Sequence, residues 1–339
     1  MTEATPAHLL WLALATGVVA AVLTWIAMLY ARERALLDPP GRRRSHALPT
    51  PRGGGVGPLV AWLAALPLAS LARTPYWVLA LGVLAVAAVG FADDHRPLPA
   101  WPRLLVHLLT ASVLAATVMG IPADRHGWAL VAAAVLALAA LVNFWNFMDG
   151  IDGLAGVQTA FVTAVLAGMA AWHGQALLSG AALTLCAATA GFLPFNFPRA
   201  RVFLGDVGSG GLGFAVAGLL LVAVTAGALS PLGAALLCSA FVVDAGMTLL
   251  WRLLGGRRWY HPHREHLYQW LVRCGIPHAK VVGLYMTWNI LIVLPVVVLT
   301  DTTAVPAMLT AGPAMALAVV LWLLARRRVL ADVRGRART

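Results

Sequence analysis

The chain has 339 residues, of which 61% are hydrophobic and only 11% are charged. Water-soluble domains of this length do not have that composition, so the sequence predicts an all-α integral membrane protein with many transmembrane helices. The formal net charge of +11 would suit a nucleic-acid-binding protein, but the distribution of the basic residues excludes that class in favour of membrane topology.

Apolar segments long enough to cross a bilayer recur along the whole chain. We expect eleven of them, at residues 7–30, 56–72, 76–91, 103–121, 127–146, 154–172, 176–195, 209–229, 231–250, 280–300 and 303–325. The first follows an acidic start without basic residues, so it is predicted to be a retained span rather than a cleaved signal. No linker or low-complexity tract interrupts the spans, and residues 1–339 are predicted to form a single transmembrane domain.

The basic residues lie almost entirely on one side of this predicted bundle. If the spans alternate in direction, 22 of the 24 Lys and Arg residues fall on the same side, in segments 31–55, 92–103, 196–207, 251–280 and 326–339. Excess positive charge in short loops marks the cytoplasmic face. The N-terminus is therefore expected outside and the C-terminus in the cytoplasm.

Five aspartates at the predicted cytoplasmic ends of spans stand out in a chain that is otherwise nearly free of acids. They are Asp93, Asp94, Asp149, Asp152 and Asp206. Ionised carboxylates are expensive beside hydrocarbon. Acids grouped in this way usually bind a divalent cation or transfer protons.

The basic loop DPPGRRRSHALPTPRGGGVG (38–57) is the first candidate segment in chain order. Its cations could neutralise phosphates, and the turn residues that follow Pro49 are more ordered than topology alone requires. A role in topology alone remains the alternative.

In FADDHRPLPAWPRLL (91–105), prolines are expected to end the helix near Pro97 and to fix Asp93 and Asp94 at the interface. Adjacent like charges favour protonation of one carboxyl group, so one of the pair could accept a proton. The alternative is a solvated helix end. A prenyl-synthase DDxxD motif would need Asp at position 97, so that class is excluded.

NFWNFMDGIDGLAG (143–156) places Asn143, Asn146 and Asp149 three residues apart, on one slowly drifting face of a helix. Asp152 follows between two glycines. Amide and carboxylate oxygens that converge in this way suit Mg²⁺ and the polar groups of a nucleotide. The alternative, small polar residues that pack helices together, explains the asparagines but not the two acids.

In RVFLGDVGSGGLG (201–213), Asp206 lies at the start of a glycine-rich helix. Backbone N–H groups at such a start favour a phosphate, and the carboxylate could bind its Mg²⁺. A simple N-cap is the alternative. An intramembrane aspartyl protease would need Gly-x-Gly-Asp, whereas position 203 is Phe203.

The segment WYHPHREHLYQW (259–270) contains His261, His263, Arg264 and His266. These side chains could hold phosphate oxygens or donate a proton. Their spacing, together with Glu265, also leaves a zinc site open. The three cysteines form no CxxC pair and indicate neither a metal site nor a disulfide framework.

Taken together, these five segments resemble the polyprenyl-phosphate N-acetylhexosamine-1-phosphate transferases of bacterial glycosyltransferase family 4. The resemblance covers residues 38–270 and includes the order of the motifs. The basic loop and the run HREHLYQ are most similar to the branch that initiates O-antigen or other surface-glycan synthesis. The peptidoglycan branch usually has consecutive histidines, whereas Pro262 separates His261 from His263 here. A muramoyl-pentapeptide substrate is therefore not expected.

The resemblance implies a Mg²⁺-dependent enzyme, with Mn²⁺ as a substitute, in the bacterial inner membrane. Its substrates would be a UDP-N-acetylhexosamine and undecaprenyl phosphate, its product UMP, and its assembly a homodimer. The catalytic face would be cytoplasmic, formed by loops 31–55, 92–103, 146–153, 196–208 and 251–280.

Carried over by position, the resemblance also implies a role for each motif. Asp206 and Asn146 would contact the metal, and Asp93 and Asp94 would lie beside the lipid phosphate. Asp93 would be the better proton acceptor, and a covalent phospho-sugar intermediate on Asp93 is the alternative to direct attack by the lipid phosphate. Asp149 and Asp152 would order the nucleotide pocket or the groups around the metal ligands, and both would be catalytic residues, as would Asp93 and Asp94. The remaining substrate-binding residues would be Asn143, Arg44, His46, Arg52, His263, Arg264 and His266, of which His263 would also be catalytic.

The alternative from another class is an ion-coupled transporter that uses aspartates as a cation relay. Such a relay needs acids near the bilayer midplane, and only Asp244 approaches that position. The transferred sugar and the glycan pathway are not determined by these motifs, because related sugars differ by only a few hydrogen-bonding groups.

Overall fold

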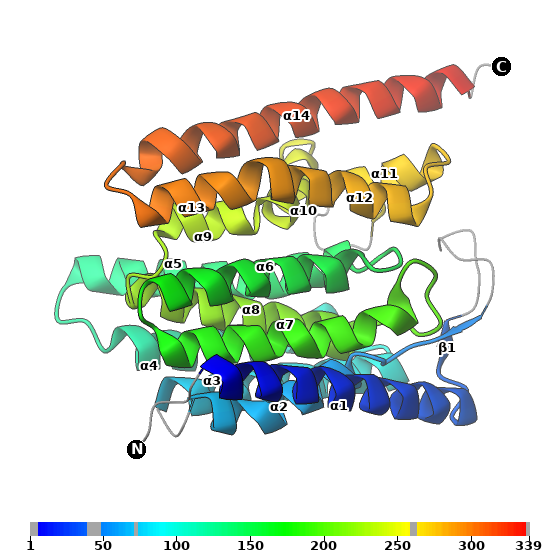
Figure 1. Cartoon of the computed structure of the whole chain (residues 1–339). Coiled ribbons are helices and arrows are strands. Elements are labelled where there is room, and N and C mark those ends of the chain that lie inside the picture. The colour runs from blue at the N-terminus through cyan, green and yellow to red at the C-terminus, as the bar shows by residue number, and fades with distance from the viewer. Residues whose placement is uncertain (1–5, 39–48, 71–73, 258–262, 337–339) are drawn as a thin grey trace. The chain divides into compact units, whose positions relative to one another are not determined.

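The computed structural model describes residues 6–38, 49–70, 74–257 and 263–336 (Figure 1). In chain order its elements are α1 (Pro6–Glu33), β1 (Leu37–Asp38), β2 (Thr50–Pro51), α2 (Val56–Ser70), α3 (Thr74–His95), α4 (Ala100–Met119), α5 (Arg125–Met148), α6 (Leu154–Trp172), α7 (Ala176–Asn196), α8 (Gly205–Thr225), α9 (Pro231–Leu237), α10 (Ser239–Leu254), α11 (Leu267–Arg273), α12 (His278–Trp288), the π-helical turn η1 (Asn289–Val293), α13 (Leu294–Thr302) and α14 (Ala307–Arg336).

The predicted all-α, multi-span class is confirmed. Within the described residues, nine helices are long and apolar enough to cross a membrane, and α9 with α10 forms a tenth candidate that is bent by 84°. Helix α2 has 15 residues, about 22 Å, which is short for a hydrocarbon core of about 30 Å. The expected number of eleven spans therefore depends on both α2 and the bent pair, and the orientation of the termini remains a prediction.

The segment that follows the last predicted span is helical. A cytoplasmic tail was expected from residue 326, where the first of three consecutive arginines occurs, but α14 continues as a helix to Arg336. Basic side chains are favourable at a helix C-terminus and can extend out of the hydrocarbon, so charge ends the apolar segment without ending the helix. The expected loop 251–280 likewise contains α11.

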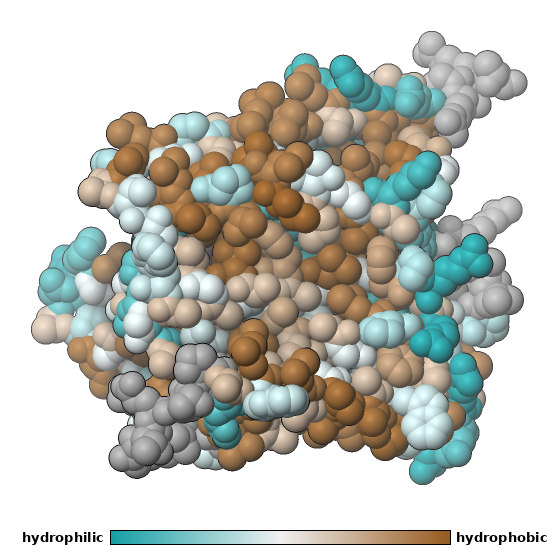
Figure 2. Space-filling model, in the orientation of Figure 1, coloured by the Kyte–Doolittle hydropathy of each residue, from teal (hydrophilic) through white to brown (hydrophobic). Residues whose placement is uncertain are grey.

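The expected single domain consists of two compact units, Met1–Leu229 and Ser230–Thr339. We call them the N-terminal and the C-terminal unit and describe each by itself. Figure 2 shows hydrophobic side chains over much of the visible surface. Exposed apolar side chains include Trp11 and Leu14 of α1 and Leu309 of α14, as expected for helices that face lipid.

Helix α8 forms the core of the N-terminal unit. Of its most apolar 18-residue stretch, 83% is buried, against 22% for α5. A helix that is apolar on all sides belongs in such a central position. A glycine of a neighbouring helix allows close approach: Gly90 of α3 packs so tightly against α8 that a Cβ there would lie 2.4 Å from the carbonyl oxygen of Asp206.

The chain segments that precede α2 and α8 meet at one end of this bundle. The turn before α2 pairs with the segment before α8, where Gly54 and Gly55 donate to the carbonyl groups of Phe203 and Leu204, each at 2.9 Å. The short β1–β2 hairpin adjoins the same turn, since Phe203 donates to Pro51 at 2.8 Å. Chain segments that are far apart in sequence are thereby fixed side by side.

In the C-terminal unit, the π-helical turn η1 joins α12 and α13 into one apolar stretch, His278–Thr302. Buried side chains of α10, α11 and α14 form an apolar cluster: Val243, Leu267, Ala318, Trp322 and Val329. This cluster places α11 against the two long helices.

Candidate active site

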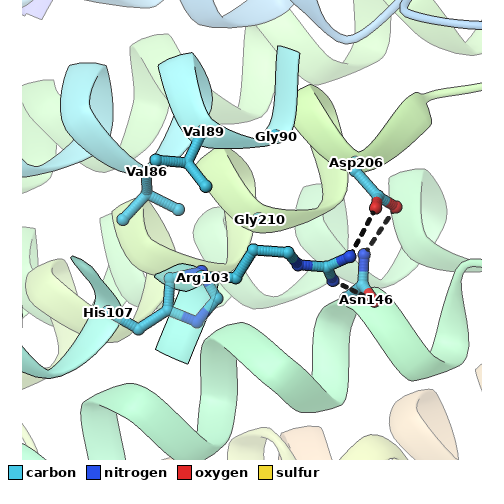
Figure 3. Close-up of a pocket in the computed structure, with 8 residues that line it drawn as sticks. All are labelled: Val86, Val89, Gly90, Arg103, His107, Asn146, Asp206 and Gly210. Atoms are coloured by element: carbon cyan, nitrogen blue, oxygen red, sulfur yellow. Dashed lines mark hydrogen bonds and ion pairs between the residues drawn. The ribbon is translucent and has the colours of Figure 1, made fainter. Parts of the chain in front are cut away.

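Four helix ends, from three of the predicted motif segments, form a polar site in the N-terminal unit. Asp93 lies in the last turn of α3, Arg103 in the first turn of α4, Asn146 in the last turn of α5 and Asp206 in the first turn of α8. Arg103, Asn146 and Asp206 line one small pocket, together with Val86, Val89, Gly90, His107 and Gly210 (Figure 3).

The guanidinium group of Arg103 is the centre of this site. Its Nη1 donates to Asp93 Oδ2 at 2.6 Å and to Asp206 Oδ2 at 3.0 Å. Its Nη2 donates to Asn146 Oδ1 at 3.3 Å (Figure 3). Two carboxylates and an amide oxygen from three different helices therefore converge on one cation, which offsets their charge in a partly buried position.

Asp206 is also held by Asn146. The Asn146 amide donates to Asp206 Oδ1 at 2.8 Å and to Ser209 Oγ at 3.0 Å, one turn along α8. The structure thus brings together Asp206 and Asn146, the two residues predicted to contact a metal. Asn143 contacts the edge of the site: its amide donates to the carbonyl group of Ala139 at 2.7 Å and lies 3.5 Å from Nδ1 of His107, which lines the pocket.

The two members of the paired-aspartate motif have different partners. Asp94 accepts from the backbone N–H groups of Asp206 and Val207, each at 3.1 Å, and so caps the start of α8. Asp93 accepts from Leu98 N–H at 2.5 Å in addition to Arg103. The amides at the start of α8, which we expected to favour a phosphate, therefore bind Asp94 instead, because a carboxylate of the same chain meets their charge.

Asp149 and Asp152 lie in the short connection between α5 and α6. Gly153 ends that connection with φ of 79° and donates to Asn196 Oδ1 at 3.0 Å. Loss of water contact, together with the negative charges of Asp206, Asp94 and Asp152, raises the pKa of Asp149 well above its usual range. Asp149 thus shares the electrostatic environment of the site without a place in its hydrogen-bond network with Arg103.

Of the predicted basic-loop residues, Arg52 forms an ion pair with Asp38 across the β1–β2 hairpin. Arg44 and His46 lie outside the described residues. The hairpin tethers Arg52 beside the turn that precedes α2, where its backbone N–H donates to Leu36 at 3.0 Å.

The histidine loop, residues 263–266, belongs to the C-terminal unit. The His263 and His266 rings pack with centroids 4.9 Å apart. Partial burial, reinforced by the nearby positive charges of His266 and Arg252, lowers the pKa of His263 to about 4. Burial also lowers the pKa of His266. Near neutral pH, the permanent positive charge of this loop therefore lies on Arg264.

Glu265 pairs with Arg252, and its Oε2 accepts from Arg257 at 2.9 Å. His261, a further ligand in the zinc alternative, lies outside the described residues. Within the described ranges, no group of three or more His, Cys, Asp or Glu side chains is arranged to hold a metal ion.

The donor set around Arg103 nevertheless fits Mg²⁺. This ion prefers oxygen ligands and is usually bound by one or two carboxylates plus substrate phosphates. Asp93, Asp206 and Asn146 supply such oxygens and already converge on a cation in the form of Arg103. Asp93, Asp206 and Asn146 would hold such an ion through the oxygens that now accept from Arg103.

Sequence reasoning missed Arg103, which was counted only as a topological charge. A signal was present, because Arg103 lies in the first turn of α4, where a positive charge opposes the helix dipole unless it is paired. Ser209 and Asn196 were missed as well. Both are small polar groups of a kind that commonly packs helices, so their pattern does not mark them as functional.

Comparisons with known proteins cover most of the chain. Residues 76–224 match the protein family described as glycosyl transferase family 4. The decaprenyl-phosphate N-acetylglucosaminephosphotransferase of Mycobacterium tuberculosis is 31% identical over an alignment that covers 80% of this chain and 78% of that protein.

Two further relatives carry related names. A protein of Bacillus subtilis named "Probable undecaprenyl-phosphate N-acetylglucosaminyl 1-phosphate transferase" is 24% identical over 77% of this chain and 76% of its own length. The phospho-N-acetylmuramoyl-pentapeptide-transferase of a Synechococcus species is 34% identical over 57% of this chain and 62% of its own length.

Proposed function

This chain belongs to glycosyl transferase family 4, among the polyprenyl-phosphate sugar-1-phosphate transferases, and we propose that it transfers an N-acetylhexosamine 1-phosphate from a UDP-sugar to undecaprenyl phosphate with release of UMP. The observation that carries the proposal is the convergence of Asp93, Asp206 and Asn146 on one cation position. A reaction between two anionic phosphate compounds needs such a position.

The reaction requires one displacement at phosphorus. An oxygen of the lipid phosphate attacks the β-phosphorus of the UDP-sugar, a new P–O bond forms, and the bond from the β-phosphorus to the bridging oxygen breaks. The bridging oxygen keeps the electron pair and leaves with UMP. The lipid then carries a pyrophosphate linked to the sugar.

The side chains of the site divide this work. Asp93 accepts a proton from the lipid phosphate or orients it, while Arg103 changes its partners from carboxylates to phosphate oxygens as the substrates bind. Asp206 and Asn146 would hold Mg²⁺, with Mn²⁺ as a substitute. When bound, the ion would neutralise pyrophosphate charge and favour departure of UMP.

The remaining assignments follow from the resemblance. Asp149 and Asp152 would order the nucleotide, and His263 with Arg264 would bind the sugar pyrophosphate. Because His263 is neutral near pH 7, it would act there as a hydrogen-bonding group, and Arg264 would supply the charge. Asp94 would act indirectly, because it accepts from the backbone at the start of α8 and thereby fixes the helix turn that carries Asp206.

We further propose a cytoplasmic active-site face in a bacterial inner membrane and a role at the first membrane step of surface-glycan synthesis, with O-antigen as one such glycan. The two N-acetylglucosamine-phosphate transferase names among the relatives make UDP-N-acetylglucosamine the first donor to test. The excess of basic residues in the loops on that face supports the orientation.

The proposal is tested by UMP release from purified protein. UDP-N-acetylglucosamine, UDP-N-acetylgalactosamine and other UDP-N-acetylhexosamines would each be supplied with undecaprenyl phosphate and Mg²⁺. We expect release with at least one donor, and none when the lipid phosphate or the metal is left out. Absence of release over the whole panel would contradict the proposal. Ion flux into liposomes without UMP release would instead support the transporter alternative.

A further inference from the structure

Asp244 of α10 carries a buried carboxylate, only 2% exposed, that accepts four hydrogen bonds. Its Oδ1 accepts from the backbone N–H of Leu267 at 2.7 Å and from the indole N–H of Trp322 at 3.0 Å. Its Oδ2 accepts from the N–H of Tyr268 at 3.2 Å and the hydroxyl group of Tyr285 at 2.7 Å. The donors belong to α11, α14 and α12.

These four bonds define what Asp244 can do. A carboxylate offers about four lone-pair directions, and donors of the same unit fill all of them. The side chain therefore has no acceptor position left for a substrate or for a transported cation. A buried carboxylate bound in this way fixes the elements that supply its donors. Its loss would leave those buried donors without an acceptor, which is destabilising.

Two of the donors directly follow the histidine loop. Leu267 and Tyr268 are the first residues of α11, so their bonds to Asp244 fix the backbone immediately after His266. Within the loop, Glu265 pairs with Arg252, which also belongs to α10. Asp244 and Arg252 lie about two turns apart on that helix. Helix α10 thus holds the histidine loop at two points.

We propose that Asp244 is a positioning residue for the histidine loop, and that it sets the placement of His263 and Arg264 for the sugar pyrophosphate. This inference rests on the proposed function, which assigns those two side chains to the donor substrate. Asp244 itself touches no substrate. It acts by fixing the start of α11, and its contribution appears in the affinity for the UDP-sugar.

A contribution to stability alone would look different. Val243, Leu267 and Trp322 around Asp244 belong to the apolar cluster of the C-terminal unit, so loss of the carboxylate could simply loosen that cluster. Such loosening would lower the melting temperature and the amount of active protein, and would leave the KM for each substrate unchanged. The ratio of KM effects on the two substrates therefore separates the alternatives.

The test uses the full-length protein with three substitutions. Asp244→Asn keeps the shape but turns an N–H₂ group toward the donors. Tyr285→Phe removes one donor and keeps the carboxylate, so it remains informative if Asp244→Asn fails to fold. Asp301→Asn is the matched control, because Asp301 accepts from the backbone N–H of Ser230 at 2.7 Å, before α9 of the same unit.

Two measurements are made on each variant: hydrogen–deuterium exchange of segment 263–270, and the KM for UDP-N-acetylglucosamine and for undecaprenyl phosphate. We expect Asp244→Asn to speed exchange in this segment and to raise the UDP-sugar KM about tenfold, with the lipid KM changed less than about twofold. Tyr285→Phe should act in the same direction but less, and Asp301→Asn should do neither.

Equal KM effects on both substrates, or unchanged exchange in segment 263–270, would overturn the inference. Wild-type protein that releases no UMP with any donor would instead overturn the proposed function. The exchange measurement does not depend on turnover, so it would still decide whether Asp244 fixes the loop. The two failures therefore appear in different experiments.

Discussion

At the scale of single residues, the site depends on the competition for a few carboxylate oxygens. Asp93, Asp206 and Asn146 share Arg103 as their counter-cation. Any divalent ion that binds there must replace guanidinium contacts. Metal affinity should therefore respond to Arg103 and to Asp206 in opposite directions.

Binding of Mn²⁺, followed by electron paramagnetic resonance without substrates, tests this expectation. Asp206→Asn removes a charged ligand and should weaken binding at least about tenfold. Arg103→Gln removes a competing cation and should tighten binding about fivefold, which corresponds to about 1 kcal/mol of repulsion. Equal affinities in the three proteins would show that the ion binds elsewhere.

The histidine loop predicts a pH dependence of stability. Burial lowers the pKa of His263 to about 4, whereas a histidine in an unfolded chain titrates near 6.5. As the pH falls from about 6.5 toward 4, the unfolded state binds a proton that the folded state does not, so stability should decrease in this window. His266, whose pKa is also lowered, acts in the same direction.

Thermal unfolding measured from pH 7.5 to pH 4.5 would show this loss as a falling melting temperature. His263→Gln cannot take up the proton, so its melting temperature should fall less steeply than that of the wild type. Near pH 7.5 the His263 imidazole is neutral in both the folded and the unfolded state, so it contributes no pH dependence to the melting temperature there. Parallel curves for the two proteins would contradict the low pKa of His263.

Residue types alone identified the acids of the site but not their partners. Asp93, Asn146 and Asp206 could be predicted, because acids and amides at the ends of apolar helices have few ordinary explanations. The separate roles of Asp93 and Asp94 could not, since they depend on which carboxylate faces the start of α8. That orientation results from packing between helices that are distant in sequence.

At the scale of elements, the packing of α3 against α8 positions Asp206. Gly90 lies against the first turn of α8, and a Cβ there would be 2.4 Å from the carbonyl oxygen of Asp206 and 2.6 Å from the nitrogen of Val207. Asp94, one turn further along α3, caps the same helix start. The two contacts set both the distance and the direction of this end of α8.

Gly90→Ala should therefore displace the first turn of α8. We expect the free energy of unfolding to fall by about 1–3 kcal/mol, as for other overpacked cores, and turnover to fall although no charged group has changed. Gly168→Ala on α6 is the matched control, because no atom lies within 4 Å of a Cβ at that position. Similar melting temperatures and rates for the two variants would contradict this role of Gly90.

The element boundaries show where sequence reasoning ends. Hydropathy located the long spans well, since each needs about 20 apolar residues. It placed one span at 231–250, where the chain instead bends by 84° between α9 and α10. The bend lies at Cys238. Because position 238 is neither a proline nor a glycine, the sequence does not indicate a bend there, and we attribute it to tertiary packing.

At the scale of the whole molecule, the charge distribution predicts which side of the membrane the site faces. Single cysteines in a background without Cys186, Cys238 and Cys274 test this prediction. Arg199→Cys, between α7 and α8, should react with an impermeant maleimide only in inverted vesicles. Ala123→Cys, between α4 and α5, should react in intact cells. The reverse pattern would contradict a cytoplasmic active site.

The central claim concerns which bond of the UDP-sugar breaks, and a label on the β-phosphorus tests it most directly. UDP-N-acetylglucosamine carrying ³²P at that position would be incubated with the protein, undecaprenyl phosphate and Mg²⁺. We predict that the label enters the lipid fraction together with the sugar and that an equal amount of unlabelled UMP is released. Label that stays in water-soluble UDP while the sugar alone reaches the lipid would contradict sugar-phosphate transfer.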